Sequence, residues 1–118
     1  MSFFENKEIK ERKKELALEP NDPAAHFNLG AAYDKAGKLH DAIKEFEATI
    51  KIHPNSAEAH FNLGVLYETV NQGEKAIVHI LKAGNLFGDK NDAVNKMESR
   101  RLLKEFYRKF GFKPEDIE

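Results

Sequence analysis

Cysteine is absent from this sequence of 118 residues. The absence excludes disulfide bonds, thiolate catalysis and zinc fingers of the cysteine type, and it fits a reducing compartment. Long hydrophobic runs are missing too. Charged residues interrupt residues 1–20 too often for the core of a signal peptide, and no stretch approaches the roughly 18 apolar residues of a membrane span. We therefore expect a cytoplasmic protein with no membrane partner, either a whole short protein or a domain of a longer chain.

An excess of charge of one sign is also lacking. The 19 lysines and arginines nearly balance the 20 aspartates and glutamates, which gives a net charge of −1. Such a chain has no overall field that attracts nucleic acid or anionic membranes. Its length is that of one domain with a core of its own.

Proline is scarce and strand patterns are missing, so the chain is expected to be all-α. Between the four prolines, apolar residues recur three and four positions apart, which is the spacing of a helix face. Asp22-Pro23 and Ser56 are good helix starts, while Gly37 and the Asn71-Gln72-Gly73 stretch are expected to break helices. The pattern predicts about six helices and then a loose acidic tail; the helices cover about 4–19, 23–36, 39–53, 57–70, 73–87 and 91–110.

What the chain does contain is an internal repeat. The phrase Ala-His-Phe-Asn-Leu-Gly occurs at 25–30 and again 34 residues later at 59–64, and residues 23–56 align with 57–90 without a gap. Glycine and alanine on facing helices would allow close approach, and large apolar residues would fill the seam. The repeat positions in the first copy are Leu29, Gly30, Tyr33, Ala42, Phe46 and Pro54. In the second copy they are Leu63, Gly64, Tyr67, Ala76, Ile80 and Ala83.

This pattern resembles the tetratricopeptide repeat family. The resemblance implies an α-solenoid of antiparallel helix pairs with a right-handed superhelix. The sequence departs from the family at its usual tryptophan, where His26 and His60 stand. It also has Gly88 in place of the second proline, which we expect to end the helix through a left-handed cap, and Gly84, which should soften the last turn. We divide the single expected domain into an N-terminal helix (4–22), repeat 1 (23–56), repeat 2 (57–90), a C-terminal capping helix (91–112) and an acidic tail (113–118).

The resemblance also implies a function, because the first helices of such repeats line a concave groove that binds peptides or helices of partner proteins. By position, the groove residues would be Phe27, Ala31, Asp34, Lys35, Phe61, Asn62, Val65, Glu68, Thr69, Asn95 and Ser99. Phe27 and Phe61 can equally be read as covers of their own core. We predict a non-catalytic adaptor or scaffold that binds a protein or peptide.

One subfamily binds the acidic C-terminal tails of chaperones through lysine, asparagine and arginine residues. Phe27 and Ala31 replace the first two of these residues, and Asp92 stands in place of a lysine. Asn62 is kept and Lys96 stands in the position of the arginine, but a carboxylate ligand would lose half of its charged donors. A chaperone-tail clamp is therefore not expected.

The last helix offers an alternative function. Between residues 96 and 113, positive residues outnumber the two glutamates, Glu98 and Glu105. The positive residues are Lys96, Arg100, Arg101, Lys104, Arg108, Lys109 and Lys113. The pattern could bind nucleic acid or another acidic partner, but we favour a solvated cap that the acidic tail (Glu115, Asp116, Glu118) partly neutralises. Self-assembly is a further alternative, because apolar residues gather near both ends at Phe3, Phe4, Phe106, Tyr107 and Phe110.

Signs of catalysis are poor. No set of residues supplies a nucleophile, a base and an oxyanion site together. His26 and His60 are expected to fill the tryptophan slot, and His40, His53 and His79 share no spacing. The sequence therefore predicts no enzyme, no metal site and no cofactor.

Overall fold

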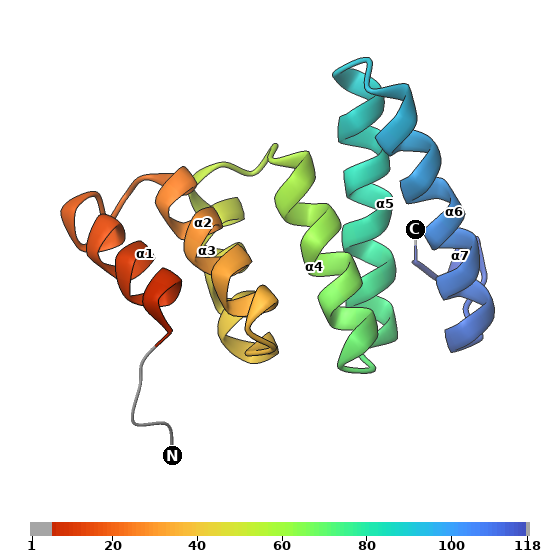
Figure 1. Ribbon diagram of the computed structural model, residues 1–118. Coiled ribbons are helices and arrows are strands. Elements are labelled where there is room, and N and C mark those ends of the chain that lie inside the picture. The colour runs from red at the N-terminus through yellow and green to blue at the C-terminus, as the bar shows by residue number, and fades with distance from the viewer. Residues whose placement is uncertain (1–5, 118) are drawn as a thin grey trace. The chain divides into compact units, whose positions relative to one another are not determined.

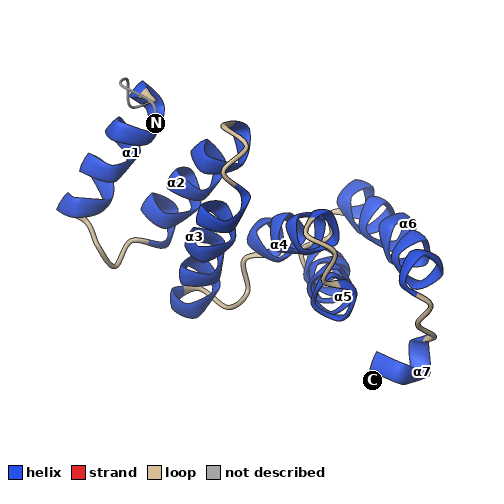
Figure 2. Cartoon of the chain, turned by 90° about the horizontal axis from the view of Figure 1, so that it is seen from below, coloured by secondary structure: helices blue, strands red, loops and turns tan. Residues whose placement is uncertain are grey.

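The computed structural model describes residues 6–117, and over this range every element of secondary structure is a helix (Figures 1 and 2). The all-α prediction is thus confirmed. The helices are α1 (Lys7–Leu18), α2 (Pro23–Lys35), α3 (Leu39–Ile52), α4 (Ala57–Thr69), α5 (Gly73–Asp89), α6 (Ala93–Phe110) and α7 (Pro114–Ile117). Phe3, Phe4 and Glu118, which the sequence analysis used, lie outside the described residues.

The C-terminal tail corrects one expectation. In place of a loose segment, residues 114–117 form the short helix α7, which packs on α5. The Asp116 carboxylate accepts a hydrogen bond from the Lys113 backbone N–H at 2.8 Å. Proline suits the first position of a helix because the N–H that it lacks needs no partner there. The chain therefore has seven helices in the described range, where about six were expected.

The chain forms two compact units, Met1–Pro54 and Asn55–Glu118. In the first unit, α2 packs against both α1 and α3. The Asp22 carboxylate caps α2 by accepting from the Ala24 N–H at 2.9 Å. A Cβ added to Gly30 would lie 3.1 Å from the ring of Phe46, which is fully buried. The glycine therefore lets this ring fill the seam between α2 and α3, as the sequence predicts.

In the second unit, α5 packs between α4 and α6, and Figure 1 shows it beside each of them. The Ser56 hydroxyl caps α4 by accepting from the Ala59 N–H at 3.2 Å. A Cβ on Gly64 would lie 3.1 Å from the backbone nitrogen of Ile80, so the backbones of α4 and α5 approach closely at this point.

The two glycines late in α5 do not have the roles expected of them. The helix runs past Gly84 and Gly88 to Asp89, and the left-handed residue is Asn91 with φ of 59°. A Cβ on Gly84 would meet Ser99 at 3.2 Å, and a Cβ on Gly88 would meet the Lys96 side chain at the same distance. These glycines make room for α6, and neither of them ends the helix.

The turns inside the two helix pairs are equivalent. Gly37 has a φ of 76° and Asn71, 34 positions later, has a φ of 63°. Asparagine tolerates this left-handed conformation better than most residues. Gly73 is the first residue of α5, and a Cβ there would overlap the ring of Phe110. Asn71 thus makes the turn, while Gly73 allows the end of α6 to approach.

Candidate partner-binding site

In the first unit, the predicted groove residues divide into a core residue and three surface residues. Phe27 is half-buried, and its ring meets that of Phe46 edge-on with the centroids 5.2 Å apart. Ala31, Asp34 and Lys35 are exposed on α2. Phe27 therefore packs on its own core, and the more exposed surface is formed by the other three.

The second unit repeats this division. The half-buried Phe61 packs on Phe87 with ring centroids 6.3 Å apart. Val65 is 36% exposed, and the Thr69 hydroxyl donates to its carbonyl oxygen at 3.0 Å. Asn62 is partly buried, and Glu68 forms an ion pair with Lys109 of α6. An exposed valine bordered by polar groups therefore lies on α4.

The two predicted groove residues of α6 differ in access. Asn95 is exposed and its side-chain amide donates to the Asp92 carboxylate at 2.8 Å. Ser99 is 1% exposed, lies against Gly84, and donates its hydroxyl to the Asn95 carbonyl oxygen at 2.8 Å. Ser99 thus helps to pack α6 on α5 and offers no hydroxyl to a partner.

The two histidines in the tryptophan slot each bind a side chain 19 residues later. Nδ1 of His26 lies 2.8 Å from Oε1 of Glu45, and Nδ1 of His60 lies 3.0 Å from Nδ1 of His79. Nε2 of His26 also lies 2.8 Å from the Pro20 carbonyl oxygen. His79 stands 34 positions after Glu45, so the two contacts occupy equivalent positions of the two repeats. Aligning position 45 with position 79 would have found the pair.

The His60–His79 pair belongs to a stack of rings. The His79 ring stacks on His60 at 5.2 Å and on Tyr67 at 5.6 Å between centroids, and Lys75 lies over the Tyr67 ring. Burial lowers the pKa of His79 to about 4, and the positive charges of His60, Lys75 and Lys82 contribute. His79 is therefore neutral near pH 7 and able to share a hydrogen bond with His60.

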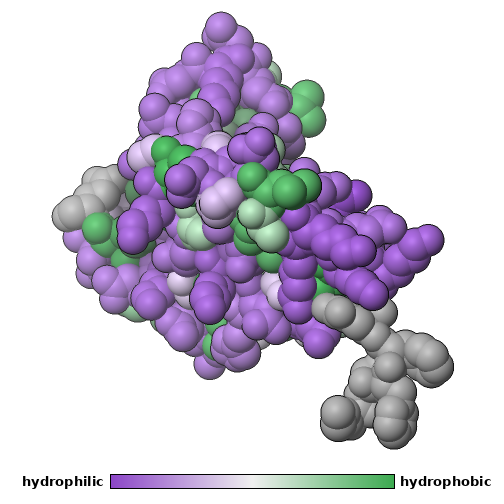
Figure 3. All heavy atoms as spheres, turned by 90° about the vertical axis from the view of Figure 1, so that its left-hand side faces the viewer, coloured by the Kyte–Doolittle hydropathy of each residue, from purple (hydrophilic) through white to green (hydrophobic). Residues whose placement is uncertain are grey.

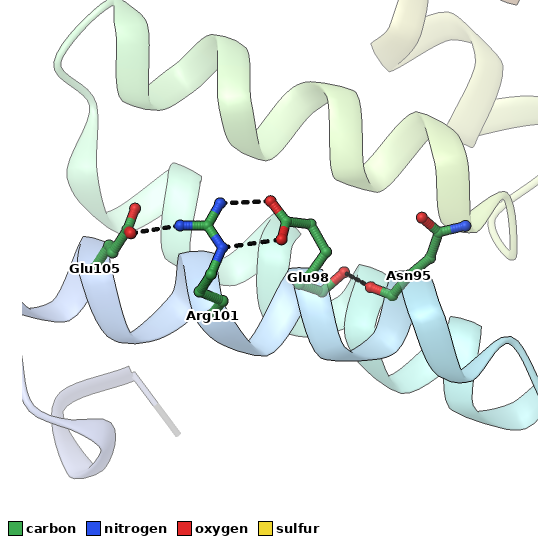
Figure 4. A network of polar contacts seen from close by, with 5 residues as sticks. Asn95, Glu98, Arg101 and Glu105 are labelled. Carbon is green, nitrogen blue, oxygen red and sulfur yellow. Dashed lines mark hydrogen bonds and ion pairs between the residues drawn. The ribbon is translucent and has the colours of Figure 1, made fainter.

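The positive residues of α6 fall into two groups. Arg101 binds both glutamates of the helix, with Nη2 2.5 Å from Glu98 and Nη1 2.5 Å from Glu105 (Figure 4). The hydrogen bond from Arg101 lowers the pKa of Glu98. Arg100, Lys104 and Arg108 are exposed, and none forms an ion pair with a described residue, Glu115 and Asp116 of the tail included. Glu115 and Asp116 of the tail therefore do not pair with these three residues, and Glu118 lies outside the described residues.

Within residues 6–117, no three or more histidines and carboxylates are grouped so that they could hold a metal ion. No helix in the same range is both long and apolar enough to cross a membrane.

Comparisons with known proteins agree with this architecture. Two family models match, one described as a tetratricopeptide repeat over residues 13–44 and one as a TPR repeat over residues 34–70. A search of curated proteins finds no match.

Solved structures of similar fold include the type III secretion translocator chaperone SycD of Yersinia enterocolitica. Its TM-score is 0.81, with 16% identity over 86% of this chain and 70% of that chain. A crystal structure of MamA gives a TM-score of 0.62, with 21% identity over 86% of this chain and 67% of that one. A MamA RS-1 ArsTM double mutant gives 0.60, with 26% identity over 86% and 65%.

The repeated helix pairs, their glycine contacts and the two family matches agree, and residues 13–70 of the chain contain tetratricopeptide repeats. Such repeats generally form non-catalytic modules for protein interaction.

Proposed function

We propose that this chain is a non-catalytic adaptor that binds a segment of a partner protein on the exposed faces of α2 and α4. The proposal rests on one observation: each repeat has an exposed apolar residue at the same repeat position. Ala31 and Val65 are 34 residues apart, and both are exposed although the residues beside them, Gly30 and Gly64, are buried. Interaction surfaces of this kind combine an apolar centre with a polar rim.

The rims of the two faces differ in chemistry. On α2, Asp34 and Lys35 follow Ala31, and Nζ of Lys35 lies 3.5 Å from the Glu8 carboxylate. On α4, Val65 is followed by Thr69 and by Glu68, whose charge is compensated by Lys109. A partner segment with small apolar side chains and hydrogen-bonding groups fits both faces. A strongly charged partner would find few free charges on α4.

The structure also decides which variants can test the proposal. Aspartate in place of Phe27 or Phe61 would disturb the ring contacts with Phe46 and Phe87 and so confuse loss of folding with loss of binding. Val65→Asp changes the surface of α4. Val78→Asp is a matched control, because Val78 is 44% exposed in the same unit but lies on α5.

The test is affinity capture from lysate of the source cells, with mass spectrometry of the bound proteins. A partner held by the wild-type chain and by the Val78→Asp chain, but lost by the Val65→Asp chain, is the expected result. Equal retention by all three chains, with unchanged helicity, would rule out the α4 face as the binding site.

A further inference from the structure

The first and last long helices of the chain each correspond to half of a helix pair. Shifted back by 34 residues, α3 (Leu39–Ile52) falls on residues 5–18, where α1 lies. Shifted forward by 34 residues, α4 (Ala57–Thr69) falls on residues 91–103, where α6 begins. By this register α1 corresponds to a second helix and α6 to a first helix, and neither has its pair partner among the described residues.

The outward face of α6 is the face that the second helix of a pair would cover. Met97 occupies the position of Leu63, which is fully buried against α5, yet Met97 is 71% exposed. Val94, three residues earlier, is 78% exposed. Arg100 and Lys104 continue this face at helical spacing, and neither is ion-paired to a described residue. We call Met97, Arg100 and Lys104 the cationic row.

The surface of α1 carries a row of opposite charge. Leu18 is 82% exposed, and Glu15 and Glu11 precede it at helical spacing. Arg12 of the same helix binds Glu15 at 2.7 Å, but the Glu15 side chain remains 48% exposed. We call Leu18, Glu15 and Glu11 the acidic row.

The two rows match when one of them is reversed. In the cationic row, arginine follows methionine by three residues and lysine follows arginine by four. Read backwards, the acidic row has the same spacings from leucine to glutamate to glutamate. The helices of a pair in this protein run antiparallel, and each row spans about 10 Å at 1.5 Å per residue. In antiparallel contact, Leu18 would meet Met97, Glu15 would meet Arg100, and Glu11 would meet Lys104.

We propose that α1 of one copy of this chain docks antiparallel on α6 of a second copy and completes a helix pair between the chains. The contact joins two different surfaces, so it extends head to tail from copy to copy. Lys10 and Lys14 border the acidic row, so a shifted register brings like charges together and is disfavoured.

This interface is held by charge more than by apolar packing. Glu98 stands where Gly64 permits close approach in the second repeat, so the two helices cannot pack as closely there. The face drawn in Figure 3 is largely hydrophilic, with hydrophobic side chains in small separate groups. Association of this kind weakens as salt screens the charges.

Charge reversal tests the proposal on the full chain. The two variants are Glu11→Lys/Glu15→Lys, which reverses the acidic row, and Arg100→Glu/Lys104→Glu, which reverses the cationic row. The control is Lys44→Glu/Lys51→Glu, which changes two exposed lysines of α3. Sedimentation velocity at about 50 mM and about 500 mM salt reports the mass. Circular dichroism verifies that each variant is folded.

The wild-type chain and the α3 control should increase in mass with concentration at low salt and return to monomer at high salt. Each reversed variant should be monomeric alone. An equimolar mixture of the two should regain the wild-type mass, as should one chain that carries both reversals. The proposal is overturned by a wild-type chain that stays monomeric at low salt and high concentration, or by reversed variants that fail to restore association when mixed. If the wild-type chain stays monomeric, the cationic row would be free to bind an acidic segment of a different protein.

Discussion

Acid should weaken the second helix pair through the His60–His79 contact. At neutral pH one Nδ1 donates to the other across 3.0 Å, and this requires at least one neutral ring. When both rings are protonated, both nitrogens carry hydrogens, so the hydrogen bond is lost and two positive charges face each other. The first repeat has a carboxylate at the same place, and a protonated His26 would still attract Glu45.

The sign and size of the effect follow from the pKa of His79. Its pKa falls from 6.5 to about 4 on folding, so the unfolded chain binds more protons in this interval. The stability that the neutral ring contributes is complete above pH 6.5 and is lost as the pH falls toward 4. For one titrating group, the free energy of unfolding changes by at most about 1.4 kcal/mol per pH unit. Because the ring is only half-buried and solvent screens part of the charge, we expect a total loss of about 1–2 kcal/mol.

Urea denaturation followed by circular dichroism, at about pH 7 and about pH 4.5, measures this loss. His79→Gln removes the titrating ring and should reduce the pH-dependent loss by about 1–2 kcal/mol relative to the wild-type chain. His40→Gln, which removes an exposed histidine, should leave the loss unchanged. An identical loss in the wild-type and His79→Gln chains would show that the His79 ring does not cause it.

Three further outcomes are expected. Phe46→Ala should cost about 3–5 kcal/mol in urea denaturation, because the ring is fully buried in the seam of the first pair. Gly64→Ala should lower stability by about 1–3 kcal/mol, since its Cβ would meet the Ile80 backbone, while Val65→Ala at the exposed neighbouring position should change it by less than about 0.5 kcal/mol. Fluorescence anisotropy with single-stranded RNA at about 150 mM salt should show no binding, because the net charge of −1 provides no general attraction.

The sequence predicted most of the fold because its main signals are local. The helical spacing of apolar residues, the caps at Asp22 and Ser56 and the recurrence of leucine, glycine and tyrosine all act within one helix pair. Gly30 and Gly64 were predicted to allow close approach, and both do so. Because the pattern occurs twice, the residues of each copy support the prediction made from the other copy.

The features that could not be predicted depend on contacts with α6 or between ring side chains. Gly84 was expected to soften the last turn of α5, and Gly88 and Gly73 were expected to end or break a helix, whereas each makes room for a side chain of α6. The burial of Ser99 has the same origin. His79 differs, because its partner could have been found by aligning it with Glu45.

The central claim is that a partner segment binds on the exposed faces of α2 and α4. The most direct test is NMR titration of the isotope-labelled chain with the segment of the captured partner that it holds. The account predicts that the backbone amide signals of Ala31, Asp34, Val65 and Thr69 shift most, while those on the outer side of α5, such as Val78, stay in place. Shifts confined to α5 or to the cationic row of α6 would contradict it.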